Sequence, residues 1–361
     1  MRFVLIVLLL ALIFSQGHSR HQNYSTAPPF NNQIVNTNLD LTDFHGAYTL
    51  NGSIYVNYVI SGKAVEKKIA GGNNMELSWS PDGNWILFSH TPDLMLDSTR
   101  SSIMIIHPDG TGFHELTTDK YNDFNPTWSR DGSNFIIFNR FDSAKWRWYI
   151  YRTQTNANPG DEIPISDLSH NESGFTCLRD GRIIVFSDRG AENIRAYLFS
   201  SSPETDGYYR PPYMFVLTPE PGKAGKYEQM RFREKLEGFP FHMTLSKDET
   251  RLSYELDYYY MHKPFTYWTW KRSIGVAEID ASNNTVSNQN IVYDSKSVED
   301  FPGFPSMTGD NRGLIYFLHI RIVNTIYFYF YYYDFKTKKS ERISTPSGGE
   351  YLYFCAQSIP R

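Results

Sequence analysis

Short apolar segments alternate with polar turns along most of the chain, and one arrangement of them recurs. The segments "ELSWSPDGNWILFSH" (76–90) and "NPTWSRDGSNFIIFNR" (125–140) share a tryptophan, a serine, a variable residue, Asp-Gly and then an apolar run. Asp-Gly between two apolar runs is a strong hairpin signal, because both central residues can adopt positive φ. The pattern predicts an inner strand, a tight turn and a second strand. The tryptophan is expected to pack between neighbouring copies, and the serine and aspartate to bond the turn backbone.

Weaker copies of this hairpin extend the repeat over the rest of the chain. They are "HGAYTLNGSIYVNYV" (45–59), "GFTCLRDGRIIVFSD" (174–188), "HMTLSKDETRLSYEL" (242–256) and "FPSMTGDNRGLIYFL" (304–318). A second hairpin follows several copies, most clearly in residues 101–118. Each unit is therefore expected to be a four-stranded meander, and six units predict an all-β fold, a six-bladed β-propeller.

The spacing of the turns predicts where the ring closes and where it is extended. Asn51 and Asp82 are 31 residues apart, the next two intervals are 49 residues, and the last two are 68 and 62. The short first interval indicates a missing strand, which the C-terminal segment 350–357 is expected to supply, closing the ring. The long intervals predict insertions at 203–238 and 257–272.

These motifs resemble a known repeat. The Trp-Ser-Pro-Asp-Gly hairpin and the segment "PDGTGFHELT" (108–117) are similar to the WD40-like (PD40), TolB-type β-propeller repeat, and the resemblance covers most of residues 43–357. Related repeats form the propellers of prolyl-oligopeptidase-like proteases and of oligogalacturonate lyases. TolB proteins carry an α/β domain before the propeller. Only about 25 residues precede the first repeat after the leader, so that domain is expected to be missing here.

The first residues have the pattern of a secretory leader. One arginine precedes a 12-residue apolar run, and small residues follow at Ser15, Gly17 and Ser19. A membrane-spanning helix needs about 20 apolar residues, so a signal peptide over 1–19 is favoured over an uncleaved anchor. We expect an N-terminal segment over 20–42 and the propeller over 43–361. The protein is expected to be secreted, or periplasmic if bacterial, without stable membrane insertion.

Composition excludes some partners and bears on the cysteines. The net charge of −4 provides no basic field, which argues against nucleic acid as a partner. Aromatic residues make up 16% of the chain, which favours strands.

The two cysteines, Cys177 and Cys355, fall in opposite blades and are expected to be buried and unbridged. The protein is expected to be a monomer, and four N-x-[ST] sequons are present at Asn23, Asn51, Asn171 and Asn283.

The first candidate site lies at the centre of the predicted ring. The sequence contains no G-x-S-x-G, H-E-x-x-H or phosphate-loop motif. The residue three positions before each tryptophan equivalent is expected to face the channel: His45, Glu76, Asn125, Gly174, His242 and Phe304. His45, Glu76 and His242 could hold one divalent metal through imidazole and carboxylate ligands. Alternatively, these polar residues line a water-filled channel and hydrogen-bond one another.

The second candidate site is aromatic. Tyr208, Tyr209, Trp268 and Trp270 fall in the two predicted insertions, where exposed rings could stack on sugars or contact a peptide partner. The alternative is packing on a strand face.

Together these observations predict a binding scaffold for a protein or glycan partner, with no cofactor and no catalysis of its own. One alternative is a metal-dependent, lyase-like carbohydrate-active enzyme that holds one divalent metal at the channel. Another is a degenerate protease propeller that works alone as a binding module.

Overall fold

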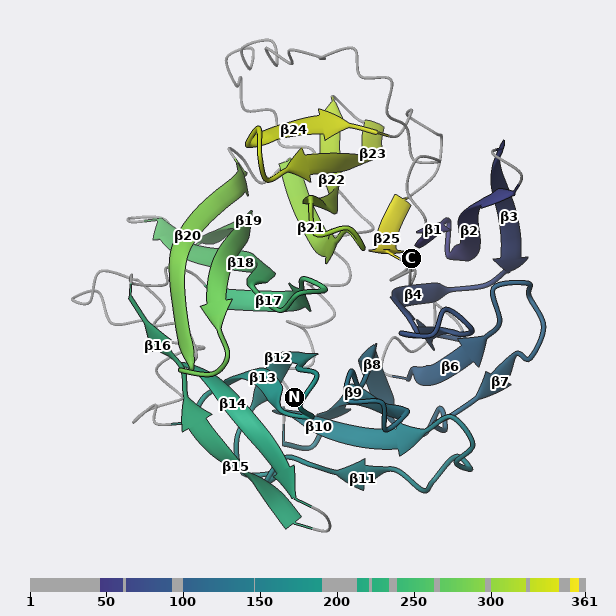
Figure 1. The fold of residues 1–361 in the computed structure, drawn as a ribbon, viewed down its shortest axis with the longest axis vertical. Helices are drawn as coiled ribbons and strands as arrows, with labels where there is room; N and C mark the ends of the chain where they lie inside the picture. The colour runs from purple at the N-terminus through teal and green to yellow at the C-terminus, as the bar shows by residue number, and fades with distance from the viewer. Residues whose placement is uncertain are drawn as a thin grey trace. The chain divides into compact units, whose positions relative to one another are not determined.

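Strand pairing in the computed structural model gathers the described residues into six sheets. The described residues are 46–60, 63–92, 100–145, 147–189, 213–220, 223–233, 239–262, 267–295, 300–322, 325–343 and 351–356. They belong to one unit, Thr37–Arg361. Figure 1 shows the sheets arranged around a common centre, as the repeat predicts for a six-bladed β-propeller.

Each blade is an antiparallel meander of four strands, ordered from the centre outward. The second blade contains β4 (Asn74–Trp79), β5 (Ile86–His90), β6 (Ser102–Ile106) and β7 (His114–Glu115), and the third contains β8 (Asn122–Trp128), β9 (Phe135–Asp142), β10 (Arg147–Gln154) and β11 (Ile163–Pro164). The fourth contains β12 (Glu172–Cys177), β13 (Ile183–Ser187), β14 (Tyr213–Glu220) and β15 (Lys223–Gln229). The fifth contains β17 (Phe239–Leu245), β18 (Arg251–His262), β19 (Tyr267–Asp280) and β20 (Thr285–Asp294), to which the short β16 (Arg231–Phe232) adds a parallel edge. The sixth contains β21 (Asp300–Met307), β22 (Gly313–Ile322), β23 (Thr325–Asp334) and β24 (Lys339–Arg342).

The C-terminal strand completes the first blade, as the short first interval predicts. That blade has the order β25 (Tyr351–Ala356), β1 (Gly46–Leu50), β2 (Ser53–Ile60) and β3 (Lys63–Ala70). Cys355 of β25 pairs with Ala47 of β1, and β25 contacts the innermost strands β4 and β21 of the two neighbouring blades. The Asn51-Gly52 turn therefore joins the second and third strands of its blade. The sequence alignment had placed it between the first and second strands, because the turn signal is the same for any hairpin.

Apolar contacts fill all six spaces between neighbouring blades. Trp79, Trp128, Cys177, Leu245 and Met307 occupy the tryptophan position, and each packs in a cluster shared with an adjacent blade. A sixth cluster, containing Tyr48 and Phe317, joins the first blade to the sixth. The expectation that the tryptophan position packs between blades is confirmed. Because each blade buries its faces against both neighbours, the ring has no open apolar face at its closure.

The hairpin turns confirm the role assigned to their serine and aspartate. The Ser80 hydroxyl accepts a hydrogen bond from the Trp85 amide at 2.9 Å, and Asp82 accepts one from the Asn84 amide at 3.0 Å. Positive φ occurs at Gly83 but not at Asp82, so the expectation that both residues adopt it is wrong for this turn. The reason is that Gly83 ends a four-residue turn closed by its amide on the Ser80 carbonyl, at 3.0 Å. Both residues of the Asn51-Gly52 turn do have positive φ.

The described residues of the two predicted insertions are mostly in strands. β14 and β15 lie within 203–238 and are the outer strands of the fourth blade. β18 and β19 reach into 257–272 and pair with each other there, with Tyr259 opposite Trp270. The described parts of the long intervals are therefore strands of the blades themselves, which the first-hairpin motif does not detect because its turn signal is absent from them.

Candidate functional site

A β-bulge recurs in four of the innermost strands at one equivalent position. The residues at the bulges are Glu76, Asn125, His242 and Phe304, with φ of 55°, 53°, 38° and 48°. The pairing register of each strand shifts at this point. Left-handed backbone is uncommon for residues other than glycine, and a bulge redirects the side chain and the amide of the extra residue. All four residues line one cavity of about 380 Å³.

Two carboxylates bind the amides that these bulges expose. Glu76 accepts hydrogen bonds from the Asn125 amide at 2.6 Å and from the Ser89 hydroxyl at 2.5 Å. Glu255 of β18 accepts one from the Phe304 amide at 2.5 Å. The bonds from the Asn125 and Phe304 amides cross between neighbouring blades, so these two carboxylates stabilise the ring.

His242 lies between the two carboxylates. Its Nδ1 is 3.0 Å from Glu255 and its Nε2 is 3.9 Å from Glu76, and Arg272 pairs with Glu255 at 2.9 Å. Burial opposes the charged form of the imidazole, but Glu255 and Glu76 raise the pKa of His242 to about 9. Burial likewise opposes ionisation of Glu255, but Arg272 and His242 hold its pKa below the usual value. The arrangement is a charged histidine shared by two carboxylates.

The described structure does not test the metal site predicted from His45, Glu76 and His242, which stays a prediction. Both ring nitrogens of His242 face carboxylates, and a metal would have to replace the protons that these contacts favour. His45 lies outside the described residues, and the strand that follows it, β1, is second in its blade. Within the described ranges, no group of three or more His, Cys, Asp or Glu side chains could hold a metal ion.

One end of the cavity is formed by the hairpin turns, and we call it the mouth. Its residues come from the variable position of the Ser-x-Asp-Gly motif in successive blades: Pro81, Arg130, Arg179, Lys247 and Gly309. Three of these five side chains are cationic. They come from the third, fourth and fifth blades, so the positive charge lies on one side of the mouth.

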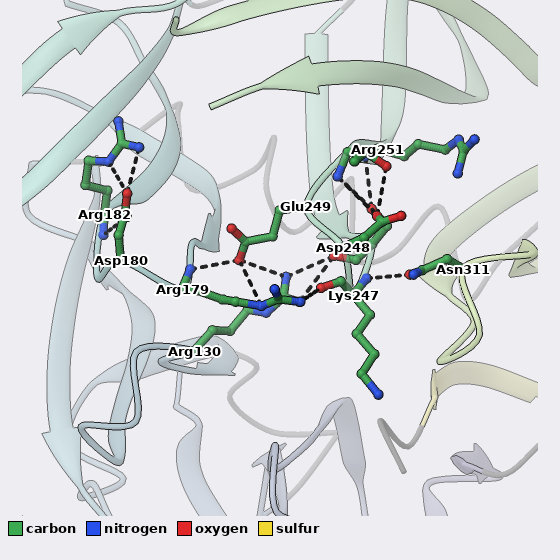
Figure 2. A network of polar contacts seen from close by, with 11 residues as sticks. Arg130, Arg179, Asp180, Arg182, Lys247, Asp248, Glu249, Arg251 and Asn311 are labelled. Carbon is green, nitrogen blue, oxygen red and sulfur yellow. Dashed lines mark hydrogen bonds and ion pairs between the residues drawn. The ribbon is translucent and has the colours of Figure 1, made fainter. Parts of the chain in front are cut away.

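A polar network fixes the two arginines of the mouth (Figure 2). Arg130 donates to the carbonyls of Ser246 at 3.2 Å and Lys247 at 3.1 Å, and the Arg179 guanidinium donates to the Lys247 carbonyl. Glu249 lies between both guanidinium groups, at 3.7 Å from Arg130 and 3.9 Å from Arg179, and it also accepts the Arg179 amide at 2.8 Å. The network ties three blades together beside the cavity.

Glu249 occupies a turn position that glycine takes in three other blades. Its φ is 60°, compared with 75°, 80° and 85° for Gly83, Gly132 and Gly181. A residue with a Cβ costs about 1 kcal/mol or more in this conformation. The contacts of the Glu249 carboxylate with the two arginines compensate for the backbone strain at this position.

The described structure does not place the side chains of the aromatic candidates. Tyr208 and Tyr209 lie outside the described residues. Trp268 and Trp270 belong to β19, where their backbones pair with Met261 and Tyr259, and their side chains are outside the described part of the structure. A surface site formed by these four residues stays a prediction.

The cationic residues of the mouth were missed by the sequence analysis, although the repeat contained the signal for them. The variable residue of the motif sits between a serine and an aspartate that both bind the turn, so its own side chain is left to point outward. Aligning this single position across the copies shows Pro, Arg, Arg, Lys and Gly. The sequence analysis also missed a buried arginine–carboxylate pair, Asp123 with Arg140 at 2.7 Å.

The comparisons with known proteins support the fold. No known family profile matches the chain, and no curated protein sequence does. Among solved structures, a TolB from Agrobacterium tumefaciens is 12% identical with a TM-score of 0.53, covering 83% of this chain and 91% of that one. Hydrazine synthase from Kuenenia stuttgartiensis is 14% identical with a TM-score of 0.52, covering 86% of this chain and 44% of that one. At these identities the likeness shows the fold alone.

Fold and cavity together define the class: the protein is a six-bladed β-propeller with a polar central cavity that opens among its hairpin turns. In the described part of the chain, no helix has the length and apolar character needed to cross a membrane.

Proposed function

We propose that the protein is a TolB-like propeller of the secretory route, or of the periplasm if bacterial, that binds a protein or glycan partner at the mouth of its channel. The observation that carries the proposal is the cavity of about 380 Å³ whose entrance presents Arg130, Arg179 and Lys247. Polar side chains held by the fold at a concave surface favour recognition of a ligand. The repeat motif and the signal-peptide pattern support the family and the location.

The closed geometry of the ring supports a scaffold that works as a monomer. The polypeptide fills all six spaces between its own blades, and β25 covers the inner edge of β1. The protein then contributes a preformed surface to its partner, and binding requires little reorganisation. No catalytic step is assigned to the residues of the channel, because His242, Glu76 and Glu255 are engaged with one another and with backbone amides.

Site-directed photocrosslinking in the native compartment tests this proposal. A photoreactive residue in place of Pro81 lies at the mouth, and one in place of Lys339 lies on an outer strand. We expect a discrete crosslinked product from position 81 that is absent from position 339. Equal labelling from both positions, or no product from position 81, would contradict a partner at the mouth.

A further inference from the structure

The charges that line the cavity are distributed unevenly. Among the described residues of its lining, Glu76 and His242 lie together at the bulges, whereas Arg130, Arg179 and Lys247 lie at the mouth. The only carboxylate bound to the mouth arginines in the network of Figure 2 is Glu249. Of these charged residues, the three cations line the cavity and Glu249 does not, so the described lining of the mouth presents positive charge.

The turn aspartates of these blades are not among the described residues that line this cavity, and each is bound within its own turn. Asp131 accepts from Ser129 at 2.5 Å, and Asp248 accepts from Ser246 at 2.6 Å. Asp180 pairs with Arg182 at 2.7 Å. Burial lowers the pKa of Arg130, Glu249 and Asp248 raise it, and Arg179 lowers it again, so two like charges are held close together. An anion at the mouth would relieve this repulsion.

A second cavity extends the mouth outward. It measures about 270 Å³ and lies between the turns of the second and third blades. Pro81, Trp128 and Arg130 line both cavities, so the two lie next to each other. Trp85 lines the outer cavity, with its ring stacked on His107 at 3.5 Å between centroids. The surface therefore suits an extended ligand that runs from the mouth across Arg130 toward Trp85.

The lining favours a peptide over a sugar chain. Sugar binding typically uses an exposed aromatic face. Trp79 and Trp128 are only 9% and 5% exposed, because they pack between blades, and Trp85 is partly buried with its ring stacked on His107. The groups offered at the mouth are charged donors, which match carboxylates. The side chain of Arg179, which is 55% exposed, can reach a ligand without leaving Glu249.

We infer that the mouth and the adjoining outer cavity bind an acidic, extended peptide segment of a partner protein, with Arg130, Arg179 and Lys247 as the carboxylate-binding residues. This inference rests on the proposed function, since it names the partner chemistry of the same site. Arg130 and Arg179 provide the planar donor pairs that suit carboxylates, and Lys247 adds a third charge. Glu249 holds the arginines in place and competes with the ligand for them.

Fluorescence anisotropy with a labelled oligoglutamate peptide tests the inference on the full-length secreted protein. The double variant Arg179→Glu and Lys247→Glu should weaken binding by about tenfold or more, and binding should also weaken as salt is raised. The matched control is Lys145→Glu with Lys226→Glu, whose side chains are 58% and 82% exposed away from the cavities. The control changes the net charge equally, and we expect its affinity to stay within about twofold of the wild type. Equal affinities in the two double variants would overturn the inference.

A single variant tests whether the Glu249 carboxylate competes with the ligand for the two arginines. Glu249→Gly suits the φ of 60° at this position and removes the negative charge, so it should tighten binding of oligoglutamate. Unchanged or weaker binding would contradict the role of Glu249.

A comparison of two ligands of equal charge distinguishes a peptide partner from a glycan partner. Oligogalacturonate of the same charge should bind more weakly than oligoglutamate, and tighter binding would assign the mouth to an acidic glycan instead. If position 81 crosslinks a partner while oligoglutamate binding is insensitive to the mouth charges, the proposed function holds and the acidic-peptide inference fails. Thermal unfolding of every variant verifies that the fold is retained.

Discussion

At the residue scale, the chemistry of a side chain in this protein depends on which neighbours the fold supplies. His242 could have been a metal ligand by its residue type, yet two carboxylates surround it and make it a cation. Glu255 is fully buried and retains its charge because Arg272 and His242 pair with it. A buried charge is tolerated only with such partners, which is why these residues occur together.

The first prediction concerns the pH dependence of stability through His242. Its pKa is about 9 in the folded protein and 6.5 ordinarily, so its contribution is complete below 6.5 and is lost as pH rises toward 9. We expect the free energy of unfolding to fall over this interval more steeply in the wild type than in His242→Gln. Denaturant titrations across the interval measure the two slopes, and equal slopes would show that His242 is not a stabilising cation.

The second prediction concerns Cys177, which is a free thiol and only 1% exposed. Burial raises the pKa of this thiol, which suppresses the reactive thiolate. In a Cys355→Ser variant, we expect a thiol reagent to label Cys177 only when denaturant unfolds the protein. Rapid labelling of the native variant would mean that the space between the third and fourth blades opens readily.

At the element scale, the hairpin turn and the inner-strand bulge are the two devices that build the cavity. The turn sets the variable residue at the mouth, and the bulge sets one side chain and one amide in the channel. Both recur at the same place in several blades, because both follow from the same repeated segment. The turn could be inferred from Asp-Gly, whereas the bulge has no such signal: Glu, Asn, His and Phe share no preference for positive φ strong enough to predict it.

The third prediction concerns acid stability through the turn aspartates. Burial opposes ionisation of Asp131, but hydrogen bonds from Ser129 and Ser133 lower its pKa below the usual 3.8. A lowered pKa stabilises the fold above the ordinary value, and the stabilisation is lost as pH falls below it. Because Asp131 is exposed, we expect Asp131→Asn to cost only about 0.5–1 kcal/mol at neutral pH and to converge with the wild type in strong acid. A constant difference between the two proteins at every pH would assign the loss to packing instead.

At the scale of the whole molecule, the six blades depend on one another because the ring is closed by its two ends. β25 fills the innermost place of the first blade and contacts β4 and β21. Without this strand, β1 would expose an unpaired edge at the centre of the ring.

The fourth prediction tests this closure by truncation. A chain that ends at residue 349 lacks β25, and we expect it to lose cooperative unfolding or to aggregate. A chain that ends at residue 356 keeps every described strand and serves as the control, which should unfold like the full-length protein. Calorimetry on both chains gives the comparison, and a fully cooperative transition in the shorter chain would show that closure is dispensable.

The sequence by itself determined the architecture and its closure. Turn residues such as Asp82-Gly83 act on their immediate neighbours, and apolar alternation sets which strand face is buried. The turns and the buried faces can therefore be recognised from the sequence. It also indicated Glu76, Asn125 and His242, since one repeat position maps to one place in every blade. Only the tertiary structure decided which side chains these residues contact. Arg130, Arg179 and Glu249 come from three different blades and become neighbours only through the curvature of the ring, and the strength of their interaction depends on the distances that result.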